Sequence, residues 1–394
     1  MPAPSSTIFI VPSWYPSPLH PEDGSFFREQ ARLIAAAGYR VVVIAVNVRS
    51  LKDFPRRHQL EDSPVRDRQA GVTEYRLESL NPAPWQPRRF FRYYRRQLRT
   101  LFQSVLEQEG RPDWVWIHSS LWAGAALAEI CHHQRIPFLI EEHLKEFFFP
   151  ERLTAFQREL IRTAYGRARL VAAPSRAVLA SILRAFPVPE NRGWVLPNPV
   201  DSRRFPLRSR SPNTRPAHWI SVGLLRPEKG FDRVIEALAD LDRLDRPGER
   251  TLTIVGSGQG KPALQKQIAA LGLTDRVHLT GYLTGPELVR QLHLATAGIW
   301  GSDMETFGLA MAEALATGLP IVVPPCGGPE DFLLPDSGVV SASGSPTDLA
   351  RSMRDVEHRV PEFEPMRIRS SLLAYCGEQA FGEQVHRLDG LLRS

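Results

Sequence analysis

One stretch of the chain, Gly301-Ser-Asp-Met-Glu-Thr-Phe-Gly-Leu-Ala-Met-Ala-Glu-Ala-Leu-Ala-Thr-Gly-Leu-Pro320, changes from a polar loop into an alanine-rich apolar segment. It follows a short apolar run from Gly298 to Trp300. The run predicts a buried strand, and the apolar segment predicts a helix that starts near Phe307. The stretch therefore indicates the strand, loop and helix of a parallel α/β sheet, with the loop at the carboxyl end of the strand.

The start of this helix has the features of an anion-binding site. The first N–H groups of a helix have no partner inside it, so those of Phe307, Gly308 and Leu309 can hold a phosphate or a sugar oxygen. Two carboxylates flank this position, because Glu305 lies in the loop and Glu313 lies about two turns into the helix. Carboxylates accept hydrogen bonds from the hydroxyl groups of a sugar and a ribose. An ordinary amphipathic helix would account for Glu313 but not for the Phe-Gly and Thr-Gly-Leu-Pro context.

Short runs rich in valine and isoleucine alternate with helical patterns along nearly the whole chain. In the first half the runs are Ile8 to Val11, Arg40 to Val46, Trp114 to His118, Phe138 to Glu141, Leu170 to Ala173 and Gly193 to Leu196. In the second half they are Ala217 to Val222, Arg250 to Val255, Val277 to Thr280, Gly298 to Trp300, Ile321 to Val323 and Val339 to Val340. Such alternation predicts two doubly wound parallel sheets covered by crossover helices. Two segments, 49–69 and 144–156, lack a strand pattern and are expected to be loops that border the ligand cleft.

The length of 394 residues favours two domains. Residues 196–216 are rich in proline and small polar side chains, so we place the interdomain linker there. The expected first domain comprises residues 1–198, and a C-terminal helix at about 378–394 returns to it. The expected second domain comprises residues 199–377.

The stretch that contains Glu305 and Glu313 resembles the Glu-x7-Glu signature of the retaining glycosyltransferases of family four, and the similarity extends over most of the chain. That family has the GT-B fold, so the resemblance implies an α/β protein of two facing Rossmann-like, doubly wound parallel-sheet domains. It also implies that the first domain binds the acceptor and the second binds the nucleotide-sugar donor. In the family the first glutamate holds hydroxyls of the donor sugar and the second holds the ribose, and these roles fall on Glu305 and Glu313.

A second segment, from Ser221 to Asp232, resembles the strand and loop that deliver basic residues to the donor diphosphate in this family. Lys229, beside a glycine at a helix start, takes the role of the lysine that neutralises the leaving nucleotide. The family commonly has arginine directly after the first glycine of this segment, where this chain has Leu224. Arg226 lies two residues further, on the same side of an extended strand, and is the candidate to replace it. An exposed loop arginine is the alternative interpretation.

Two residues of the first half complete the expected site. The sequence Ile140-Glu-Glu-His143 follows a buried strand and matches the place where the family keeps a histidine near the anomeric carbon. The resemblance therefore gives His143 a catalytic role, and a structural histidine is the alternative. Residues 14–27 resemble the first loop of the acceptor domain, in which Gly24 lets the backbone approach the donor phosphates. The frequent Gly-Gly pair of the family is Asp23-Gly24 here.

The resemblance implies a retaining hexosyl- or glycosyltransferase that moves a sugar from a nucleotide-sugar donor to a glycan, a lipid-linked or a small-molecule acceptor. It implies no cofactor and no metal, because in GT-B enzymes protein groups hold the diphosphate. Polysaccharide or cell-envelope biosynthesis fits this class. The nucleotide base, the donor sugar, the acceptor and the oligomeric state cannot be read from the sequence. Two alternatives from other classes remain, a GT-B sugar-nucleotide epimerase and a non-catalytic carbohydrate-binding protein.

Positive charge is concentrated in one segment of the chain. The net charge is +6, and the segment from Trp85 to Phe102 holds six arginines among aromatic residues without any acid. As a helix, the segment has one face with Phe91 and Tyr94 and another with arginines. This pattern is typical of a helix on an anionic membrane surface, and equally of a helix packed on its own domain with a solvated basic face. Nucleic-acid binding is not expected, because no recognition motif accompanies the segment.

Nothing in the sequence predicts a membrane span or export. No apolar run approaches the ~20 residues that cross a bilayer, and no signal peptide precedes the first strand. We therefore expect a cytoplasmic protein that is peripheral on the inner face of the membrane if the basic segment binds lipid. Cys131, Cys326 and Cys376 are too few and too widely spaced for a disulfide framework or a zinc site. Residues 256–261 fit neither a dinucleotide fingerprint nor a phosphate loop and are expected to form a strand-to-helix turn.

Overall fold

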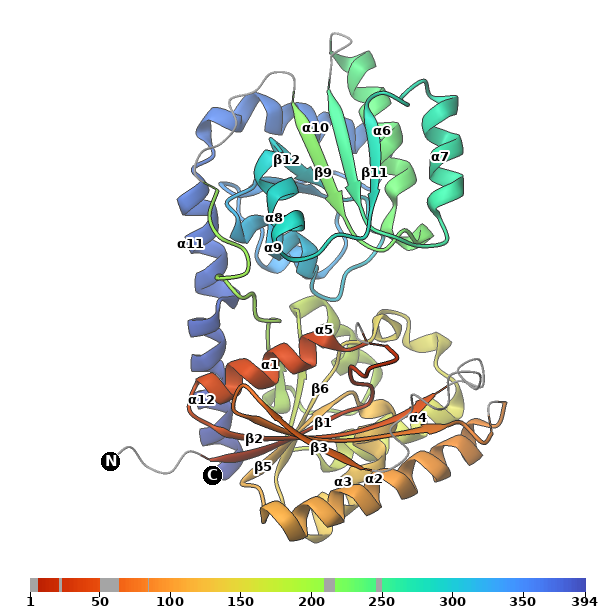
Figure 1. Cartoon of the computed structure of the whole chain (residues 1–394), viewed down its shortest axis with the longest axis vertical. Coiled ribbons are helices and arrows are strands. Elements are labelled where there is room, and N and C mark those ends of the chain that lie inside the picture. Colours follow the sequence, from red (N-terminus) through yellow and green to blue (C-terminus); the bar gives the residue numbers. More distant parts are fainter. Residues whose placement is uncertain (1–5, 21–22, 50–63, 84, 209–216, 246–249) are drawn as a thin grey trace. The chain divides into compact units, whose positions relative to one another are not determined.

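The chain divides into two compact units (Figure 1). The computed structural model describes residues 6–20, 23–49, 64–83, 85–208, 217–245 and 250–394. Unit 1 comprises Met1–Pro174, Val178–Leu196 and Phe381–Ser394, and unit 2 comprises Ser175–Ala177 and Pro197–Ala380. Most of the first expected loop, residues 50–63, and residues 209–216 of the expected linker lie outside the described residues.

Unit 1 is built on an eight-stranded sheet in the order β3-β4-β2-β1-β5-β6-β7-β8. Its strands are β1 (Thr7–Pro12), β2 (Arg40–Arg49), β3 (Val65–Gln69), β4 (Val72–Leu80), β5 (Trp114–His118), β6 (Phe138–Glu141), β7 (Leu170–Ala173) and β8 (Gly193–Val195). All neighbouring strands are parallel except β3 and β4. The chain crosses from β1 to β2 on one side and later returns to β5 on the other. A topological switch point therefore lies at the carboxyl ends of β1 and β5.

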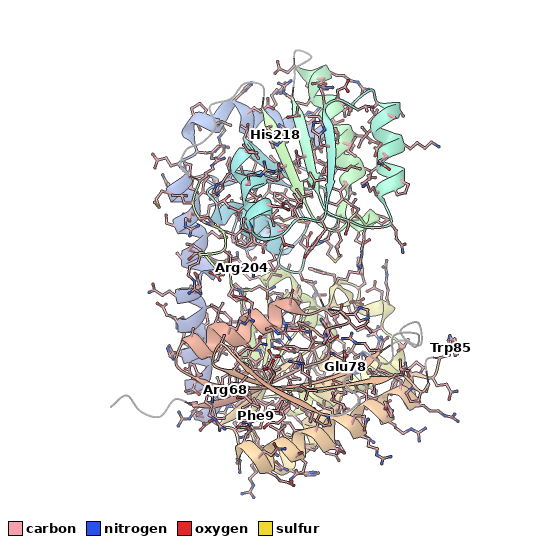
Figure 2. The ribbon with its side chains drawn as sticks, in the orientation of Figure 1. Phe9, Arg68, Glu78, Trp85, Arg204 and His218 are labelled. Carbon is pink, nitrogen blue, oxygen red and sulfur yellow. The ribbon has the colours of Figure 1, made fainter. Side chains whose placement is uncertain are left out.

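Helices cover both faces of this sheet, because successive strand residues point to opposite sides. They are α1 (Ser25–Ala36), α2 (Pro87–Glu109), α3 (Ala125–His133), α4 (Ala155–Arg167), α5 (Arg176–Ala185) and α12 (Glu378–Arg393). On one face Ile8 and Ile10 of β1 pack with apolar residues of α1 and α12. On the other face Phe9 and Val11 pack with residues of α2 to α5, and Figure 2 shows Phe9 in the interior of the unit.

The hairpin of β3 and β4 was not expected from the sequence, and the interpretation of residues 49–69 as a loop is wrong for β3. The turn between the two strands has two residues with positive φ, 49° and 82°, as a tight hairpin requires. Charged residues hide the strand character of β4, but they are buried in pairs. Glu74 contacts Arg28 at 3.1 Å, and Glu78 contacts Arg49 at 2.8 Å. Pairing of this kind explains how a charge-rich segment occupies a buried strand.

Unit 2 is built on a six-stranded, entirely parallel sheet in the order β11-β10-β9-β12-β13-β14. Its strands are β9 (His218–Val222), β10 (Thr251–Val255), β11 (Val277–Gly281), β12 (Ala297–Ile299), β13 (Ile321–Val323) and β14 (Gly338–Val340). Its helices are α6 (Phe231–Leu244), α7 (Lys261–Ala270), α8 (Gly285–Leu294), α9 (Leu309–Ala316), α10 (Pro346–Arg359) and α11 (Pro365–Cys376). The chain reverses direction across the sheet at β9, so a second switch point lies at the carboxyl ends of β9 and β12. The doubly wound parallel sheets expected from the sequence are confirmed.

Helix α2 buries the face that its sequence could have offered to a membrane. Phe91 and Tyr94 lie in the core of unit 1, so for this face the helix packs on its own domain. Arg92 and Arg96 remain exposed. Trp85, just before the helix, is 86% exposed, and Figure 2 shows it at the periphery. Across the described ranges, every helix is too short or too polar to serve as a membrane span.

The packing of α2 predicts a stability difference between its two faces. Leu98 is 0% exposed, and Leu98→Ala is expected to lower the free energy of unfolding of unit 1 by ~2–5 kcal/mol, because the lost side chain leaves a cavity. Arg96→Ala, on the exposed face, is expected to change it by no more than about 0.5 kcal/mol. Urea unfolding followed by circular dichroism measures both values. Equal destabilisation by the two substitutions would contradict the burial of this face.

Candidate functional site

The residues expected to bind the donor in unit 2 lie on the loops that leave β9 and β12. The loop after β9 carries Lys229 in a single 3-10 turn, Pro227–Lys229, directly before α6. The loop after β12 carries Glu305 and leads into α9. Open α/β sheets bind ligands at the carboxyl ends of strands beside such a switch point. Both residues therefore have the position that the sequence predicts.

Lys229 and Glu305 form an ion pair. Nζ of Lys229 lies 2.7 Å from Oε1 of Glu305, and the hydroxyl of Ser302 donates to the same oxygen at 2.8 Å. The backbone N–H of Glu305 donates to the carbonyl of Cys326 at 2.7 Å, and its carbonyl accepts from the N–H of Gly328 at 2.8 Å. The side chains of Lys229 and Glu305 are 29% and 13% exposed. A fixed carboxylate and an accessible ammonium thus lie side by side, a combination that can hold hydroxyl groups and phosphate.

Glycine residues let the loops around this pair approach each other backbone to backbone. Gly230 has a φ of +61°, and a Cβ atom there would lie 2.0 Å from the carbonyl oxygen of Gly301. A Cβ atom on Gly256 would lie 1.8 Å from the carbonyl oxygen of Gly223. Such distances exclude any side chain. The glycine-rich turn after β10 therefore allows close packing on the loop after β9.

Helix α9 begins at Leu309, two residues later than the sequence predicts. Gly308 is its N-cap with a φ of 92°, a left-handed conformation that delays the first helical turn. Phe307 is 1% exposed, and its ring packs on Phe332 at 5.1 Å, so its side chain belongs to the core. The helical bonds begin with Met311, which donates to the carbonyl of Gly308. The N–H groups of Gly308 and Leu309 thus lie at the start of the helix, where an anion can bind.

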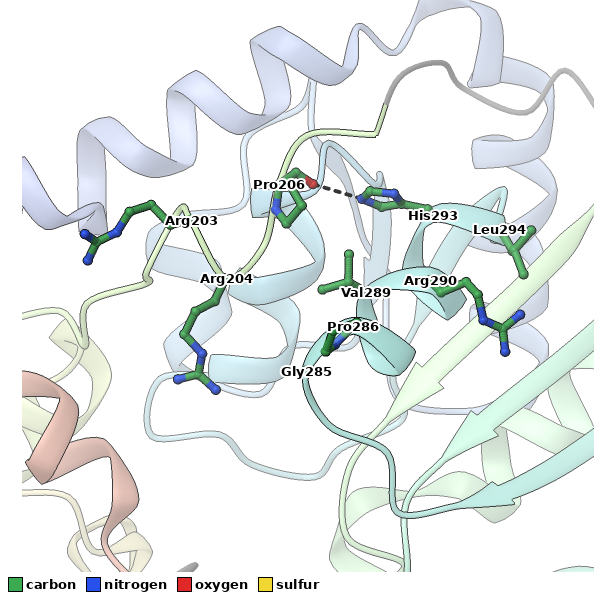
Figure 3. A pocket seen from close by; sticks show the side chains of 9 residues that line it. All are labelled: Arg203, Arg204, Pro206, Gly285, Pro286, Val289, Arg290, His293 and Leu294. Atoms are coloured by element: carbon green, nitrogen blue, oxygen red, sulfur yellow. Dashed lines mark hydrogen bonds between the residues drawn. The ribbon is translucent and has the colours of Figure 1, made fainter.

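Glu313 lies in α9, and burial raises its pKa from 4.5 to about 7, while the charge of Arg204 opposes this shift. Arg204 belongs to the segment after Pro197 that forms part of unit 2. It lines a cavity of about 600 Å³ together with Arg203 and α8 (Figure 3). In this cavity Nε2 of His293 lies 2.9 Å from the carbonyl oxygen of Pro206. The residues expected to bind the donor are not among those that line this cavity, whereas Arg204 both lines it and acts by its charge on Glu313.

Arg226 remains a less defined candidate than Lys229. It is exposed, and among the described residues its side chain forms no ion pair or hydrogen bond. Its N–H donates to the carbonyl of Leu224 at 2.8 Å, and Leu224 is itself 46% exposed. The structure therefore does not bring Arg226 into contact with the pair of Lys229 and Glu305. Its role in holding the diphosphate stays a prediction.

Gly24 lies at the carboxyl edge of unit 1, between β1 and α1. Helix α1 begins at Ser25, within residues 14–27 that were expected to form a loop, and Gly24 is its N-cap with a φ of 65°. A Cβ atom there would lie 2.8 Å from the ring of Phe27 and 3.0 Å from the carbonyl oxygen of Trp14. Only glycine fits this tight entry into the helix. Its expected contact with the donor phosphates stays a prediction.

His143 follows β6 at the same edge and contacts two residues that were not singled out from the sequence. Its Nε2 lies 3.1 Å from Nδ1 of His118 and 3.5 Å from Oε1 of Glu141. Nδ1 of His118 lies 3.3 Å from Oε2 of Glu141. His118 and Glu141 are the last residues of β5 and β6 and are direct partners in the sheet register. Their shared position at the ends of predicted strands is the signal that could have identified them.

These three side chains form a buried polar cluster. The side chains of His118, Glu141 and His143 are 1%, 0% and 5% exposed. Burial lowers the pKa of His118 to about 3 and that of His143 to about 4, so both rings are neutral near pH 7. Burial also raises the pKa of Glu141, although its carboxylate accepts hydrogen bonds from Gln30 and Trp116. Two imidazoles and a carboxylate at these distances are also a donor set that could hold a metal ion.

Comparisons with known proteins cover most of the chain. The model of glycosyltransferase family 4 matches residues 24–204, and that of glycosyl transferases group 1 matches residues 205–368. The chain is 37% identical over 158 residues to the glycogen synthase of Mycobacterium tuberculosis, which is 40% of this chain and 37% of that protein. It is 32% identical over 198 residues to the GDP-mannose-dependent alpha-mannosyltransferase of that organism, which is 48% of this chain and 46% of that protein. The chain thus matches less than half the length of these curated relatives.

Solved structures resemble the whole chain. Anabaena HepE in complex with UDP has a TM-score of 0.71 and 19% identity, with 97% of this chain and 99% of that chain covered. Sucrose-phosphate synthase from Thermosynechococcus elongatus has a TM-score of 0.74 and 16% identity, with 97% and 98% covered. These likenesses confirm the expected GT-B fold of two parallel-sheet α/β domains.

The raised pKa of Glu313 predicts a pH-dependent stability. Burial favours the protonated acid in the folded protein. The destabilisation of the folded state by the ionised Glu313 is therefore absent below the ordinary pKa of 4.5 and complete above about pH 7. Glu313→Gln removes this destabilisation. We expect the variant to gain thermal stability over the natural protein at pH 8 and to lose that gain toward pH 4.5. Thermal unfolding at both pH values tests this, with Glu362→Gln as a control because the side chain of Glu362 is 68% exposed. A gain that does not change with pH would contradict the buried-acid interpretation.

Proposed function

Because the chain belongs to the glycosyltransferases of family four, we propose that it transfers a sugar from a nucleotide-sugar donor to an acceptor hydroxyl and retains the anomeric configuration. The relatives that it matches over part of their length include a glycogen synthase and a GDP-mannose-dependent mannosyltransferase. One structural neighbour was solved with UDP bound. These names support the class of donor and leave open which base and which sugar this chain uses.

The observation that carries the proposal is the contact of Lys229 with Glu305 at 2.7 Å beside the start of α9. A nucleotide sugar joins a hydroxyl-rich ring to a diphosphate through a single glycosidic oxygen. Its recognition therefore needs an acceptor of hydrogen bonds and a source of positive charge at adjacent points. Glu305 supplies the first and Lys229 the second, and the N–H groups of Gly308 and Leu309 add further donors for phosphate oxygens. A purely structural ion pair would not need a helix start beside it.

In the proposed reaction the oxygen of the acceptor hydroxyl bonds to the anomeric carbon while the bond from that carbon to the donor phosphate oxygen breaks. The hydroxyl proton passes to the departing phosphate oxygen on the same face of the sugar, and the nucleoside diphosphate leaves. Lys229 stabilises the charge that grows on the phosphate, so we propose that this step requires no metal. Arg226 is placed in the same role, and Gly24 is assigned a contact with the phosphates. His143 keeps the position near the anomeric carbon that the family resemblance implies.

We further propose that the acceptor is lipid-linked or belongs to the cell envelope and that the protein binds the cytoplasmic face of an anionic membrane. The support is the exposed side of α2, since Arg92 and Arg96 are exposed there and Trp85 precedes them with 86% of its surface accessible. Phe91 and Tyr94 are buried in the core of unit 1 and are not available to lipid. The attraction of arginine side chains to lipid head groups therefore has to provide most of the binding free energy. A single exposed tryptophan suits the interfacial region of a bilayer.

The proposed role of Lys229 predicts a kinetic effect larger than its effect on folding. Lys229→Ala is expected to reduce kcat by ~10²- to 10³-fold, because one donor to the developing charge is lost. Glu305→Gln should also lower kcat, whereas Glu313→Gln should mainly raise KM for the donor, because a ribose contact is similar in the ground and transition states. Steady-state kinetics without added divalent metal measure these parameters. Lys266→Ala, an exposed lysine of α7, is the matched control and should leave them unchanged. Unchanged kcat and kcat/KM in Lys229→Ala would overturn the assignment.

The membrane proposal predicts binding that depends on charge. Co-sedimentation with phosphatidylglycerol vesicles should weaken as salt rises, and Arg92→Glu plus Arg96→Glu should weaken it by at least about 30-fold, since each arginine contributes roughly 1 kcal/mol at such a surface. The control is Arg351→Glu plus Arg367→Glu, which makes the same charge change on side chains that are 61% and 68% exposed in unit 2. Binding that ignores salt, or equal losses in both double variants, would argue against α2 as the contact surface.

A further inference from the structure

The cluster of His118, Glu141 and His143 has contacts that a merely structural histidine would not need. The shortest contact is the 3.1 Å between Nδ1 of His118 and Nε2 of His143, which is a hydrogen-bond distance. Only one of these nitrogens can carry the proton of that bond, because the other must accept it. The position of this proton determines whether Nδ1 of His143 donates a hydrogen bond to a ligand or accepts one from it.

Glu141 decides where this proton lies. Its carboxylate is fully buried, and a buried anion requires N–H donors around it. Gln30 donates to Oε1 at 3.1 Å, and the indole of Trp116 donates to Oε2 at 2.8 Å. The next nitrogen is Nδ1 of His118, at 3.3 Å from Oε2, and it is closer than Nε2 of His143, at 3.5 Å from Oε1. A lone pair on Nδ1 would face the carboxylate, whereas an N–H there is attracted to it, so the proton belongs on Nδ1 of His118.

This placement fixes the tautomer of His143. The N–H of His118 is directed to Nε2 of His143, which therefore accepts and is unprotonated. A neutral imidazole carries one proton, so Nδ1 of His143 bears the N–H. That nitrogen is buried and has no hydrogen-bond partner among the described residues. A buried donor without a partner is costly, so the site is prepared for an oxygen atom that the protein itself does not supply.

Two phenylalanine rings pack against the histidines of the cluster. The ring of Phe27 packs on His118 at 4.3 Å and on His143 at 5.1 Å. The half-buried ring of Phe26 lies 5.0 Å from that of His143. Neither aromatic ring offers a hydrogen-bond acceptor of ordinary strength to Nδ1 of His143. The ring of His143 therefore contacts both phenylalanine rings, and neither of them satisfies its Nδ1.

A divalent metal is the competing occupant of the cluster, and the second nitrogens argue against it. A metal bound by Nδ1 of His118 and Nε2 of His143 would leave N–H groups on Nε2 of His118 and on Nδ1 of His143. Both of these atoms are buried without a partner among the described residues. Metal-ligating histidines almost always donate this second N–H to an acceptor. The hydrogen-bonded arrangement leaves only one such donor unsatisfied, and the metal would leave two.

We propose that His118 and Glu141 are positioning residues that hold His143 as the Nδ1–H tautomer and so present an N–H donor to an oxygen of the bound sugar, phosphate or acceptor. This inference rests on the proposed function, since it names how His143 serves the transfer. Glu141 orients His118, and His118 orients His143. Neither touches the substrate.

The tautomer of His143 can be measured without an activity assay. Long-range 1H–15N correlation spectra of the full chain labelled with 15N-histidine distinguish Nδ1–H from Nε2–H rings, and the signals of His143 are assigned by their loss in His143→Ala. We expect the Nδ1–H form in the natural protein and the Nε2–H form in His118→Leu, where Nε2 of His143 has only the carboxylate of Glu141 to meet. A ring of His143 that stays in one tautomer in both proteins would overturn the inference.

Kinetic measurements on variants of His118 distinguish a positioning role of this residue from a role in folding. His118→Leu is expected to lower kcat by ~10- to 100-fold, because a misplaced group costs rate out of proportion to its movement, and to leave the affinity for the nucleoside diphosphate unchanged. In His118→Asn the side-chain amide N–H stands near the place of Nδ1, so the variant should recover most of the lost kcat. His132→Leu, an exposed histidine of unit 1, is the control. Equal kcat in His118→Leu and His118→Asn would contradict the proposal.

The tautomer and kinetic measurements also distinguish a failure of this inference from a failure of the proposed function. If no nucleotide sugar supports transfer, the proposed function fails, and the tautomer measurement still decides the hydrogen-bonded arrangement. If transfer is found and His118→Leu retains full kcat, the positioning role fails alone. Metal analysis of the natural protein is the remaining check. One equivalent of a divalent metal that is lost in His118→Leu would identify a metal centre and overturn the inference.

Discussion

The contact of Gly230 with the carbonyl of Gly301 is the constraint on which the site in unit 2 depends. A Cβ atom on Gly230 would lie 2.0 Å from that oxygen, so the two loops approach as closely as backbone allows. Lys229 directly precedes the first glycine, and Ser302 directly follows the second. Because the two backbones are in contact, side chains that are 76 residues apart in the sequence meet at 2.7 Å. The same principle operates where Gly256 meets Gly223, and together these contacts bring the loops at the ends of neighbouring strands close to one another.

In unit 1, by contrast, strands β4 and β6 carry charged side chains into the interior. Glu74 and Glu78 of β4 are buried, and each is paired with an arginine of another element, Arg28 or Arg49. Among the described residues, Glu141 of β6 pairs with no arginine and instead accepts hydrogen bonds from the neutral donors Gln30 and Trp116. Burial lowers the pKa of His118 to about 3 and that of His143 to about 4, so both rings are uncharged near pH 7 although the carboxylate of Glu141 lies beside them. The cluster of His118, Glu141 and His143 is therefore polar without carrying positive charge, in contrast to the ammonium of Lys229.

The sequence is sufficient to predict the two parallel sheets but not the segments that connect their strands. The strands Trp114–His118, Phe138–Glu141 and Leu170–Ala173 were predicted without error, because strands buried on both faces are continuous apolar runs. The hairpin of β3 and β4 was not predicted, because charged residues are normally exposed and the sequence does not show that these have buried partners. The start of α9 was placed two residues early, since only the backbone angles of Gly308 show where the helix begins. The contact of His118 with Glu141 depends on the register of β5 and β6, which a single sequence does not specify.

On the proposed function, the ion pair of Lys229 and Glu305 predicts that the site prefers an intact nucleotide sugar to the product nucleotide. A nucleoside diphosphate without its sugar would attract Lys229 to its phosphates and would leave the carboxylate of Glu305, which keeps the hydrogen bond from the hydroxyl of Ser302 at 2.8 Å, facing added negative charge. An intact nucleotide sugar brings hydroxyl groups to Glu305 at the same time as phosphates to Lys229. Each charged group then gains a partner as the contact between them is weakened. On the proposed function, the intact donor is therefore favoured over the product nucleotide by the same two side chains, and release of the product restores their mutual contact.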